Sequence, residues 1–199
     1  MEEVPDQLSF LITEERVLLT SATAEIRYIP AVFSVQEAEA YFKFLHEGID
    51  WEETTMWMYD RTVDVPRLIS HYGADAALPP EVIAMQRQIE QRLNVYFNAV
   101  GMNLYRNEKD SVAWHSDKNE DLTAHPTVAI LSFGATRPIM LREKRPPRHA
   151  IACNLEPGSA LIMTGKAQDQ FEHQIPKLPH TTGPRISVVF RTKRGNRVE

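Results

Sequence analysis

Apolar residues recur at helical spacing within the first hundred residues. The clearest set comprises Val82, Met85, Ile89, Leu93 and Tyr96. Residues three or four apart share one face of a helix, and the positions between these residues are mostly polar. Pro79 and Pro80 stand at the start of this stretch, where proline is favoured. The pattern predicts a helix whose apolar face covers a sheet. A capping box at Ser34 and Glu37 predicts another helix that runs through about His46.

From Gly101 onward the pattern changes to short runs of β-forming residues separated by turns. The runs span residues 102–105, 111–115, 127–133, 139–141, 150–155, 160–163, 171–175 and 185–191. Short strands with glycine and proline between them are typical of a double-sheet jelly roll or a barrel. We therefore predict an α+β fold in which N-terminal helices cover a β core. One domain over residues 1–199 is expected, with the β core at about 101–192.

The composition favours a soluble intracellular protein. The longest apolar runs, residues 128–133 and 159–163, are far shorter than the ~20 residues of a membrane span. The acidic start at residues 1–3 is unlike a signal peptide. Cys153 is the only cysteine, so no internal disulfide can form and a reducing compartment is expected, cytoplasmic or nuclear. We also expect a monomer.

The net charge of −5 is unevenly distributed along the chain. Residues 1–100 hold seventeen acids and seven bases, whereas residues 101–199 hold ten acids and fifteen bases. A proline-rich stretch of the second half contains the basic residues Arg137, Arg142, Lys144, Arg145 and Arg148. Such a loop could contact the phosphates of a nucleic acid, and a solvated loop without a partner is an equal alternative.

A histidine and a carboxylate stand two residues apart at His115 and Asp117, and His173 follows much later. If the first segment is a strand, both of its side chains point to the same face. Facing strands of a barrel could bring His173 to the same point. Two neutral imidazoles and one carboxylate leave half of an octahedral ion open, which is the arrangement of non-haem Fe(II) oxygenases. The spacing His-x-Asp occurs by chance in many chains, mostly at surface residues that bind no metal, so this hypothesis needs support from elsewhere in the chain.

The last predicted strand supplies that support, because it carries two arginines on one face. Arg185 and Arg191 alternate with apolar residues. An inward arginine is costly unless it is paired, and a bound dicarboxylate would provide the partner. Six residues of strand span about 20 Å, so the two arginines should have different tasks. The alternative is a terminal strand whose arginines reach solvent or pair with acids.

Several motifs, in this order, resemble the AlkB family of Fe(II)/2-oxoglutarate dioxygenases, and are most similar to the eukaryotic-type members that repair single-stranded alkylated DNA and RNA. The motifs are residues 103–112, 114–117 and 131–137, Gly158-Ser159, His173 with Pro176-Lys177, and residues 184–191. The resemblance covers roughly residues 60–192. It implies a double-stranded β-helix (jelly-roll) core and a nucleotide-recognition lid within about residues 1–100.

The resemblance also implies roles for individual residues. It implies that Fe(II) is bound by His115, Asp117 and His173. It implies that 2-oxoglutarate is bound by Asn103, Tyr105, Arg185, Ser187 and Arg191. The family usually has Asn and Thr where this chain has Ser187 and Val189, so the polar contacts to the co-substrate are expected to differ here.

The reaction implied by the resemblance is oxidative demethylation of bases such as N1-methyladenine and N3-methylcytosine in single- or double-stranded DNA or RNA. It uses Fe(II), 2-oxoglutarate and O2 and releases formaldehyde, succinate and CO2. The target base must be unstacked to reach the pocket. The candidate substrate-binding residues are Trp57, Tyr59, Arg67, Tyr72, Asn119 and Arg142. Burial in the core is the alternative for the aromatic residues, and Asn119 replaces an acid that is common in relatives.

Two other functions are compatible with the chain. The first is a 2-oxoglutarate-dependent hydroxylase or demethylase of a protein or a small molecule, which the acidic N-terminal half and Asn119 favour. The second is a non-catalytic nucleic-acid-binding barrel. The intact set of His115, Asp117 and His173 argues against the second.

Overall fold

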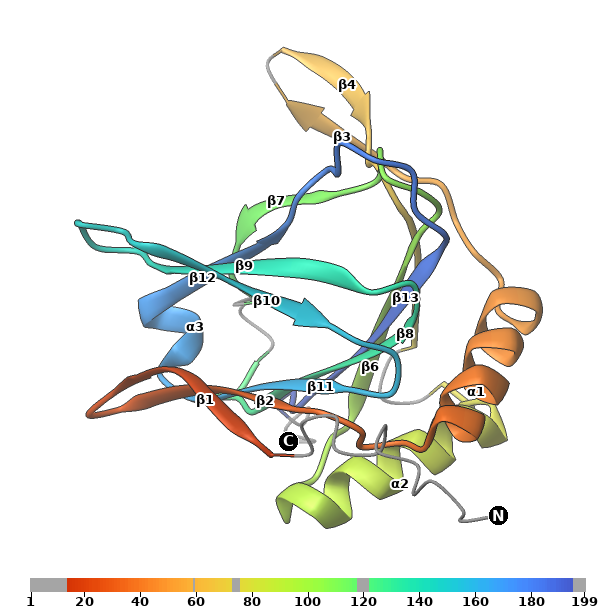
Figure 1. Ribbon diagram of the computed structural model, residues 1–199, viewed down its shortest axis with the longest axis horizontal. Helices are drawn as coiled ribbons and strands as arrows, with labels where there is room; N and C mark the ends of the chain where they lie inside the picture. The colour runs from red at the N-terminus through yellow and green to blue at the C-terminus, as the bar shows by residue number, and fades with distance from the viewer. Residues whose placement is uncertain (1–13, 59, 73–75, 118–121, 195–199) are drawn as a thin grey trace, which may run out of the picture.

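Two antiparallel sheets face one another in the computed structural model, which describes residues 14–58, 60–72, 76–117 and 122–194 (Figure 1). The larger sheet has the order β1-β2-β11-β8-β13-β6-β5 and the smaller has the order β10-β9-β12-β7. The strands of the larger sheet are β1 (Arg16–Ser21), β2 (Ala24–Ile29), β5 (Leu68–Tyr72), β6 (Ala99–Tyr105), β8 (Val128–Gly134), β11 (Ala160–Gly165) and β13 (Arg185–Arg191). Those of the smaller sheet are β7 (Val112–His115), β9 (Arg137–Glu143), β10 (Ala150–Leu155) and β12 (Phe171–Ile175). The sheets form the predicted jelly roll.

Two helices cover the outer face of the larger sheet, as the apolar spacing predicted (Figure 1). The first, α1 (Val35–Gly48), begins with the predicted capping box, in which the side chains and backbones of Ser34 and Glu37 bond reciprocally. The second, α2 (Pro80–Leu93), buries Met85 and Ile89 against the sheet. It ends earlier than predicted, because Asn94 adopts the left-handed conformation. Tyr96 therefore lies beyond the helix and is 69% exposed instead of joining the core.

A second apolar core fills the space between the two sheets. Its members come from both sides, and include Ile130 and Leu161 of the larger sheet and Leu141 and Phe171 of the smaller. Along β9 and β12 of the smaller sheet buried and less buried residues alternate, as expected when only one face is inward, whereas β8 and β11 of the larger sheet are buried along most of their length. Polar side chains that project into this space must form hydrogen bonds or ion pairs within the protein or must bind a ligand, because burial of an unpaired polar group is costly.

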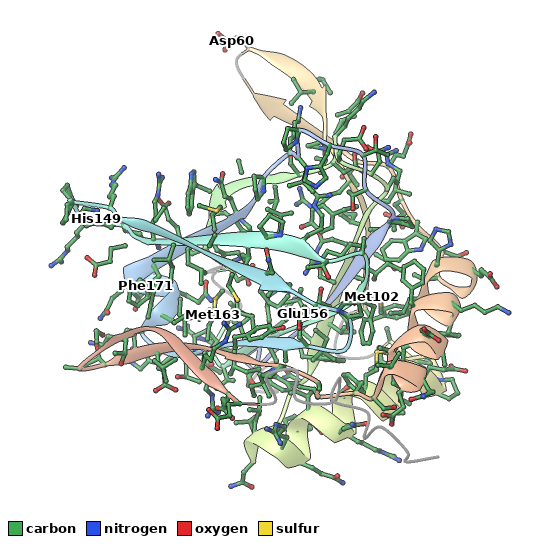
Figure 2. All side chains as sticks on the ribbon, viewed as in Figure 1. Asp60, Met102, His149, Glu156, Met163 and Phe171 are labelled. Atoms are coloured by element: carbon green, nitrogen blue, oxygen red, sulfur yellow. The ribbon has the colours of Figure 1, made fainter. Side chains whose placement is uncertain are left out.

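The first hundred residues contribute more strand than the sequence predicted. Strands β1, β2 and β5 extend the larger sheet, where only helices and a lid were expected. Strand β2 alternates buried Ala24, Ile26 and Tyr28 with less buried residues, but it is too short for this pattern to stand out in the sequence. Strands β3 (Thr55–Met58) and β4 (Arg61–Asp64) form a separate hairpin that projects away from the sheets, with Asp60 at its tip (Figures 1 and 2).

The strand register brings the candidate site residues together. Strand β13 lies between β6 and β8, with Arg185 opposite Tyr105 and Ser187 opposite Asn103. In the smaller sheet His173 of β12 lies opposite His115 of β7. A further helix, α3 (Ala167–Gln170), connects β11 to β12. In the parts of the chain that the structure describes, no helix has the length and apolar character needed to cross a bilayer.

Candidate functional site

Three potential metal ligands converge at one end of the space between the sheets. One ligand atom from each of His115, Asp117 and His173 lies within 4.8 Å of the others. The His115 Nε2 is 3.7 Å from Asp117 Oδ1, and the two imidazole rings are 4.3 Å apart between centroids. The sequence predicted a strand at residues 111–115, and His115 and Asp117 were expected to share a face if that strand continued through both of them. In the structure β7 ends at His115, so Asp117 comes from the loop that follows.

The environment of His173 and Asp117 sets these two groups in the protonation states that a metal requires. Burial lowers the pKa of His173 from 6.5 to about 4, so its imidazole is neutral at pH 7. Burial alone would raise the pKa of Asp117, but Arg191 and the two histidines outweigh it and lower the pKa below its ordinary value. Neutral imidazole and ionised carboxylate are the forms that bind metal ions.

The fit of a metal is supported by an unpartnered oxygen. Asp117 Oδ1 accepts a hydrogen bond from Arg191 Nη2 at 3.0 Å. Its Oδ2 is buried and has no hydrogen-bond partner among the described residues. A buried carboxylate oxygen without a partner is rare and points to an ion at that position. Two imidazoles and one carboxylate are the donor set of non-haem Fe(II) sites, so these residues fit Fe(II).

A cavity of about 180 Å³ opens beside the three ligands and contains every residue predicted to bind 2-oxoglutarate. Its polar lining includes Asn103, Tyr105, Arg185, Ser187 and Arg191, together with Arg67. The predicted iron ligands His115, Asp117 and His173 also line it. Its apolar walls are Val112, Ile130, Ile139, Ile175 and Val189. One cavity therefore brings together the predicted iron ligands and the predicted 2-oxoglutarate residues, which lie up to 76 positions apart in the sequence (His115 and Arg191).

Arg185 lies at the end of this cavity and is only 1% exposed. Its Nε donates to Ser132 Oγ at 2.9 Å, and the ring of Tyr105 lies 5.2 Å from its guanidinium carbon. Its Nη2 has no hydrogen-bond partner within the described parts of the chain. Burial lowers the pKa of Arg185 to about 10, which still leaves it charged at pH 7. A buried cation with a free N–H fits a carboxylate, so this end of the cavity fits a dicarboxylate co-substrate.

A row of polar contacts along the cavity joins the residue before β5 to the strands β6 and β13. Arg67, which precedes β5, donates from Nε to Asn103 Oδ1 at 2.8 Å. Asn103 Nδ2 in turn lies 3.3 Å from Ser187 Oγ. This row fixes the orientation of the Asn103 amide, with its nitrogen towards β13. Ser187 therefore has a defined partner at a position where the family usually has Asn, whereas Val189 adds only an apolar surface to the cavity.

Several predicted substrate-binding residues lie elsewhere or outside the described residues. Tyr72 packs against the helix-covered core on the opposite face of the larger sheet, because side chains alternate along β5. Arg142 lies on the outer face of the smaller sheet, where it contacts the Trp114 ring and pairs with Glu172 at 2.6 Å. Tyr59 and Asn119 lie outside the described residues, as does the side chain of Trp57. Of the predicted substrate-binding residues whose side chains the structure describes, Arg67 alone lines the cavity.

The predicted basic cluster divides into buried and exposed members. Arg137 is fully buried and donates to the backbone oxygens of Asn107, Asp110 and Pro176. Lys144 donates to Ser116 Oγ and to the Gln168 backbone oxygen. Arg145 and Arg148 are exposed between β9 and β10, a hairpin that extends away from the sheets with His149 near its tip (Figure 2). Only these two arginines of the cluster, both in the hairpin turn, remain open to a phosphate.

Three residues that the sequence analysis did not single out for the site support it from outside the cavity. Gln168 of α3 accepts a hydrogen bond from the Asp117 backbone nitrogen, and Lys144 holds the neighbouring Ser116. Arg137 ties together the loops that follow β6 and β12. The sequence offers no direct signal for Gln168, since a single glutamine has no periodicity or motif. Its position becomes visible only when α3 is placed beside β7.

The low pKa of His173 makes the stability of the metal-free protein depend on pH. The unfolded chain protonates this imidazole near pH 6.5, whereas the folded chain does so near pH 4. Between these values the unfolded state binds more protons, so the free energy of unfolding should decrease as the pH is lowered from about 6.5 to about 4, by about 1.4 kcal/mol per pH unit. Urea denaturation in a chelator should show this slope. The His173→Gln variant should show a shallower one over the same range, and equal slopes would contradict the prediction.

Comparisons with known proteins agree with this arrangement. Residues 25–191 match the family model described as the 2OG-Fe(II) oxygenase superfamily. The chain is 36% identical over 186 residues to alpha-ketoglutarate-dependent dioxygenase alkB homolog 3 of Bos taurus, covering 82% of this chain and 64% of that protein. It is 33% identical to the Homo sapiens protein of the same name, covering 88% and 68%. It is 24% identical to DNA oxidative demethylase ALKBH2 of Arabidopsis thaliana, covering 84% and 66%.

The chain thus spans about two thirds of the length of the curated relatives that it matches. Among solved structures, an oxidoreductase of the 2OG-Fe(II) oxygenase family from Burkholderia pseudomallei is similar, with a TM-score of 0.59. It covers 86% of each chain at 14% sequence identity. A likeness at this identity concerns the fold alone.

Proposed function

The chain belongs to the 2OG-Fe(II) oxygenase superfamily, and on this premise we propose that it removes N-linked methyl groups from bases of DNA or RNA. The expected lesions are of the N1-methyladenine and N3-methylcytosine type. The observation that carries the proposal is a single cavity lined by Asp117 and Arg185, whose Oδ2 and Nη2 atoms have no hydrogen-bond partner among the residues that the structure describes. One fits a metal ion and the other fits a carboxylate. The names of the relatives, which include a DNA oxidative demethylase, support the choice of substrate.

The metal and its co-substrate supply the oxidising power of the reaction. When bound, Fe(II) with 2-oxoglutarate and O2 hydroxylates the N-methyl group, which leaves as formaldehyde, while 2-oxoglutarate becomes succinate and CO2. We assign His115, Asp117 and His173 as the residues that would hold Fe(II). Arg191 holds Asp117 through its Oδ1, so the other oxygen of that carboxylate stays available for the metal. The three ligands come from one loop and two adjacent strands, which limits their relative movement.

Co-substrate binding falls to the residues at the other end of the cavity. Arg185 would pair with the distal carboxylate, beside the Tyr105 ring. Asn103 can donate its second amide hydrogen, since its oxygen is engaged by Arg67. The apolar walls, among them Ile139 and Val189, exclude water and thereby strengthen these charged contacts.

The entrance to the site faces solvent, as a macromolecular substrate requires. The His115 side chain is 35% exposed, whereas Asp117 and His173 are buried. A base that is flipped out of a strand could therefore approach the iron from the side of His115. The β3–β4 hairpin and the exposed Arg145 and Arg148 provide surfaces for the rest of a nucleic acid strand.

One chain contains the complete set of predicted iron and 2-oxoglutarate residues, so we infer that a monomer is active. The single, buried Cys153 supports an intracellular location.

A panel of substrates tests the proposed function. Single-stranded and double-stranded DNA and RNA oligonucleotides, each with one N1-methyladenine or N3-methylcytosine, are incubated with the protein, Fe(II) and 2-oxoglutarate. Formaldehyde release is expected from at least one class and not from the unmethylated oligonucleotides. Succinate formation without formaldehyde from every methylated oligonucleotide would instead favour a protein or small-molecule substrate.

The Arg185→Met variant tests the co-substrate site separately from the metal site. We expect its apparent affinity for 2-oxoglutarate to fall roughly 100-fold, or about 3 kcal/mol, as when one partner of a buried charge pair is removed. Affinity for a divalent metal should change little. The variant without ligands should be as stable as the wild type or more stable, because an unpaired buried charge is gone. Titration calorimetry with 2-oxoglutarate measures the first effect, and an unchanged affinity would contradict the assignment of Arg185.

A further inference from the structure

The loop that carries Asp117 has left the smaller sheet before it reaches the metal site. Among the described residues strand β7 is paired to β12 only, and it ends at His115. The backbone of Ser116 and Asp117 therefore lacks the hydrogen-bond ladder that holds His115 and His173. A metal ligand must nevertheless keep its position within a few tenths of an ångström. Contacts from outside the smaller sheet must therefore hold the backbone of Ser116 and Asp117.

Gln168 provides the nearest support, from α3. It is only 3% exposed, and its Oε1 accepts a hydrogen bond from the Asp117 backbone nitrogen at 2.7 Å. Its Nε2 donates to the sulfur of Met163, in the apolar core between the sheets, at 3.0 Å. The amide is thus oriented with its oxygen towards the loop. Burial of an amide is costly unless it is hydrogen-bonded, and a thioether is a weak acceptor, so the bond to Asp117 is the main compensation.

Lys144 supports the preceding residue from another direction. It stands at the base of the β9–β10 hairpin, and its Nζ donates to Ser116 Oγ at 2.8 Å and to the Gln168 backbone oxygen at 2.7 Å. Its own backbone nitrogen donates to the Gln170 oxygen at 2.9 Å. Gln168 and Lys144 therefore contact each other as well as the loop. Together they hold both residues that follow His115.

We propose that Gln168, assisted by Lys144, positions Asp117 for metal binding. Arg191 orients the carboxylate of Asp117, and Gln168 fixes the backbone from which it projects. The inference rests on the proposed function in one respect, the assignment of Asp117 as a metal ligand. Residues that orient metal ligands from outside typically contribute 10- to 100-fold to metal affinity.

The same helix offers a matched control. Gln170 lies two residues from Gln168, but its amide binds Ser21 at the end of β1 and Thr23 in the turn that follows. It makes no side-chain contact with the loop of Asp117 in the hydrogen bonds of the described residues. Replacement of Gln170 by methionine perturbs α3 without removing the support of Asp117. Methionine is close to glutamine in size and can accept no comparable hydrogen bond from the backbone.

Titration of the metal-free protein with Co(II), followed by the visible absorption of the bound ion, tests the proposal. The Gln168→Met variant should bind Co(II) at least roughly tenfold more weakly than the wild type. Gln170→Met should bind within about twofold of the wild type. Lys144→Met, at a half-buried position, should weaken binding to a smaller extent and tests the proposal even if Gln168→Met does not fold. Circular dichroism shows which variants are folded.

The possible outcomes separate the inference from the proposed function. A wild-type protein that binds no Co(II) would overturn the metal site, and with it the proposed function. Equal affinities for the wild type and a folded Gln168→Met would overturn the role of Gln168 and leave the proposed function in place. Equal losses of Co(II) affinity in Gln168→Met and Gln170→Met would show only a general effect on α3, and this result would also overturn the proposed role of Gln168. If Gln168→Met does not fold, an unchanged Co(II) affinity of Lys144→Met would overturn the proposed positioning of Asp117.

Discussion

The His115→Ala variant is expected to lose at least roughly a thousandfold in turnover, because the metal carries the oxidative chemistry. His115 supplies one of the three candidate ligand atoms, and two remaining ligands should hold the ion weakly. The side chain is 35% exposed and lies at the end of an edge strand, so its removal should leave the fold intact. Formaldehyde release from a methylated oligonucleotide and Co(II) titration measure the two effects.

The control for this variant is His180→Ala. His180 is exposed in the connection between β12 and β13, away from the lining of the cavity. It should retain full turnover and full metal affinity. Substantial turnover by His115→Ala, under conditions where the wild type and His180→Ala are equally active, would contradict the assignment of His115.

The Gly134→Ala variant is expected to lose about 2 to 5 kcal/mol of stability. Gly134 has a φ of +81°, a conformation that costs roughly 1–2 kcal/mol for a residue with a Cβ. An added Cβ would also lie 2.5 Å from the Phe42 ring and 2.5 Å from the Pro184 backbone oxygen. Overpacking of this kind typically costs a further 1–3 kcal/mol. Urea denaturation measures the loss.

The same substitution should also disturb co-substrate binding, because Gly134 lies directly opposite Arg185 in the sheet. Relief of the contact with Pro184 would shift the start of β13, which carries Arg185. Gly183→Ala is the matched control, since an added Cβ there meets only the Ala135 Cβ at 3.9 Å. It should change stability by less than about 0.5 kcal/mol. Comparable losses in the two variants would contradict this explanation.

The elements that could be predicted from the sequence are those with a strong local pattern. The capping box of Ser34 and Glu37 and the apolar spacing of Met85 and Ile89 identified both long helices. The strands from β6 onward were also identified, because turns separate them clearly. Strands β1, β2 and β5 were missed, since a short run with mixed exposure, such as β1, has no distinct period. Such strands are defined by their neighbours in the sheet.

The site could be predicted where its residues form motifs, and not where they act through the fold. The motifs led to His115, Asp117 and His173, and the structure places these residues together as expected. Tyr72 was predicted to bind substrate, but it packs against the helix-covered core. The face of β5 that it occupies depends on the pairing with β6, which the sequence does not show. The number of residues in the basic cluster that are available to a phosphate was overestimated, because charge alone does not show that Arg137 donates to three backbone oxygens. Gln168 required knowledge of a contact across 51 positions.

The most direct test of the proposed activity measures both products in one reaction. The wild-type protein, with Fe(II) binding verified, is given 2-oxoglutarate, O2 and a single-stranded oligonucleotide with one N3-methylcytosine. We predict one formaldehyde for each methyl group lost and at least one succinate, with both products absent when Fe(II) is omitted. Retention of the methyl group without formaldehyde, in this oligonucleotide and in its N1-methyladenine and RNA counterparts, would contradict the assignment of this chain as a nucleic-acid demethylase.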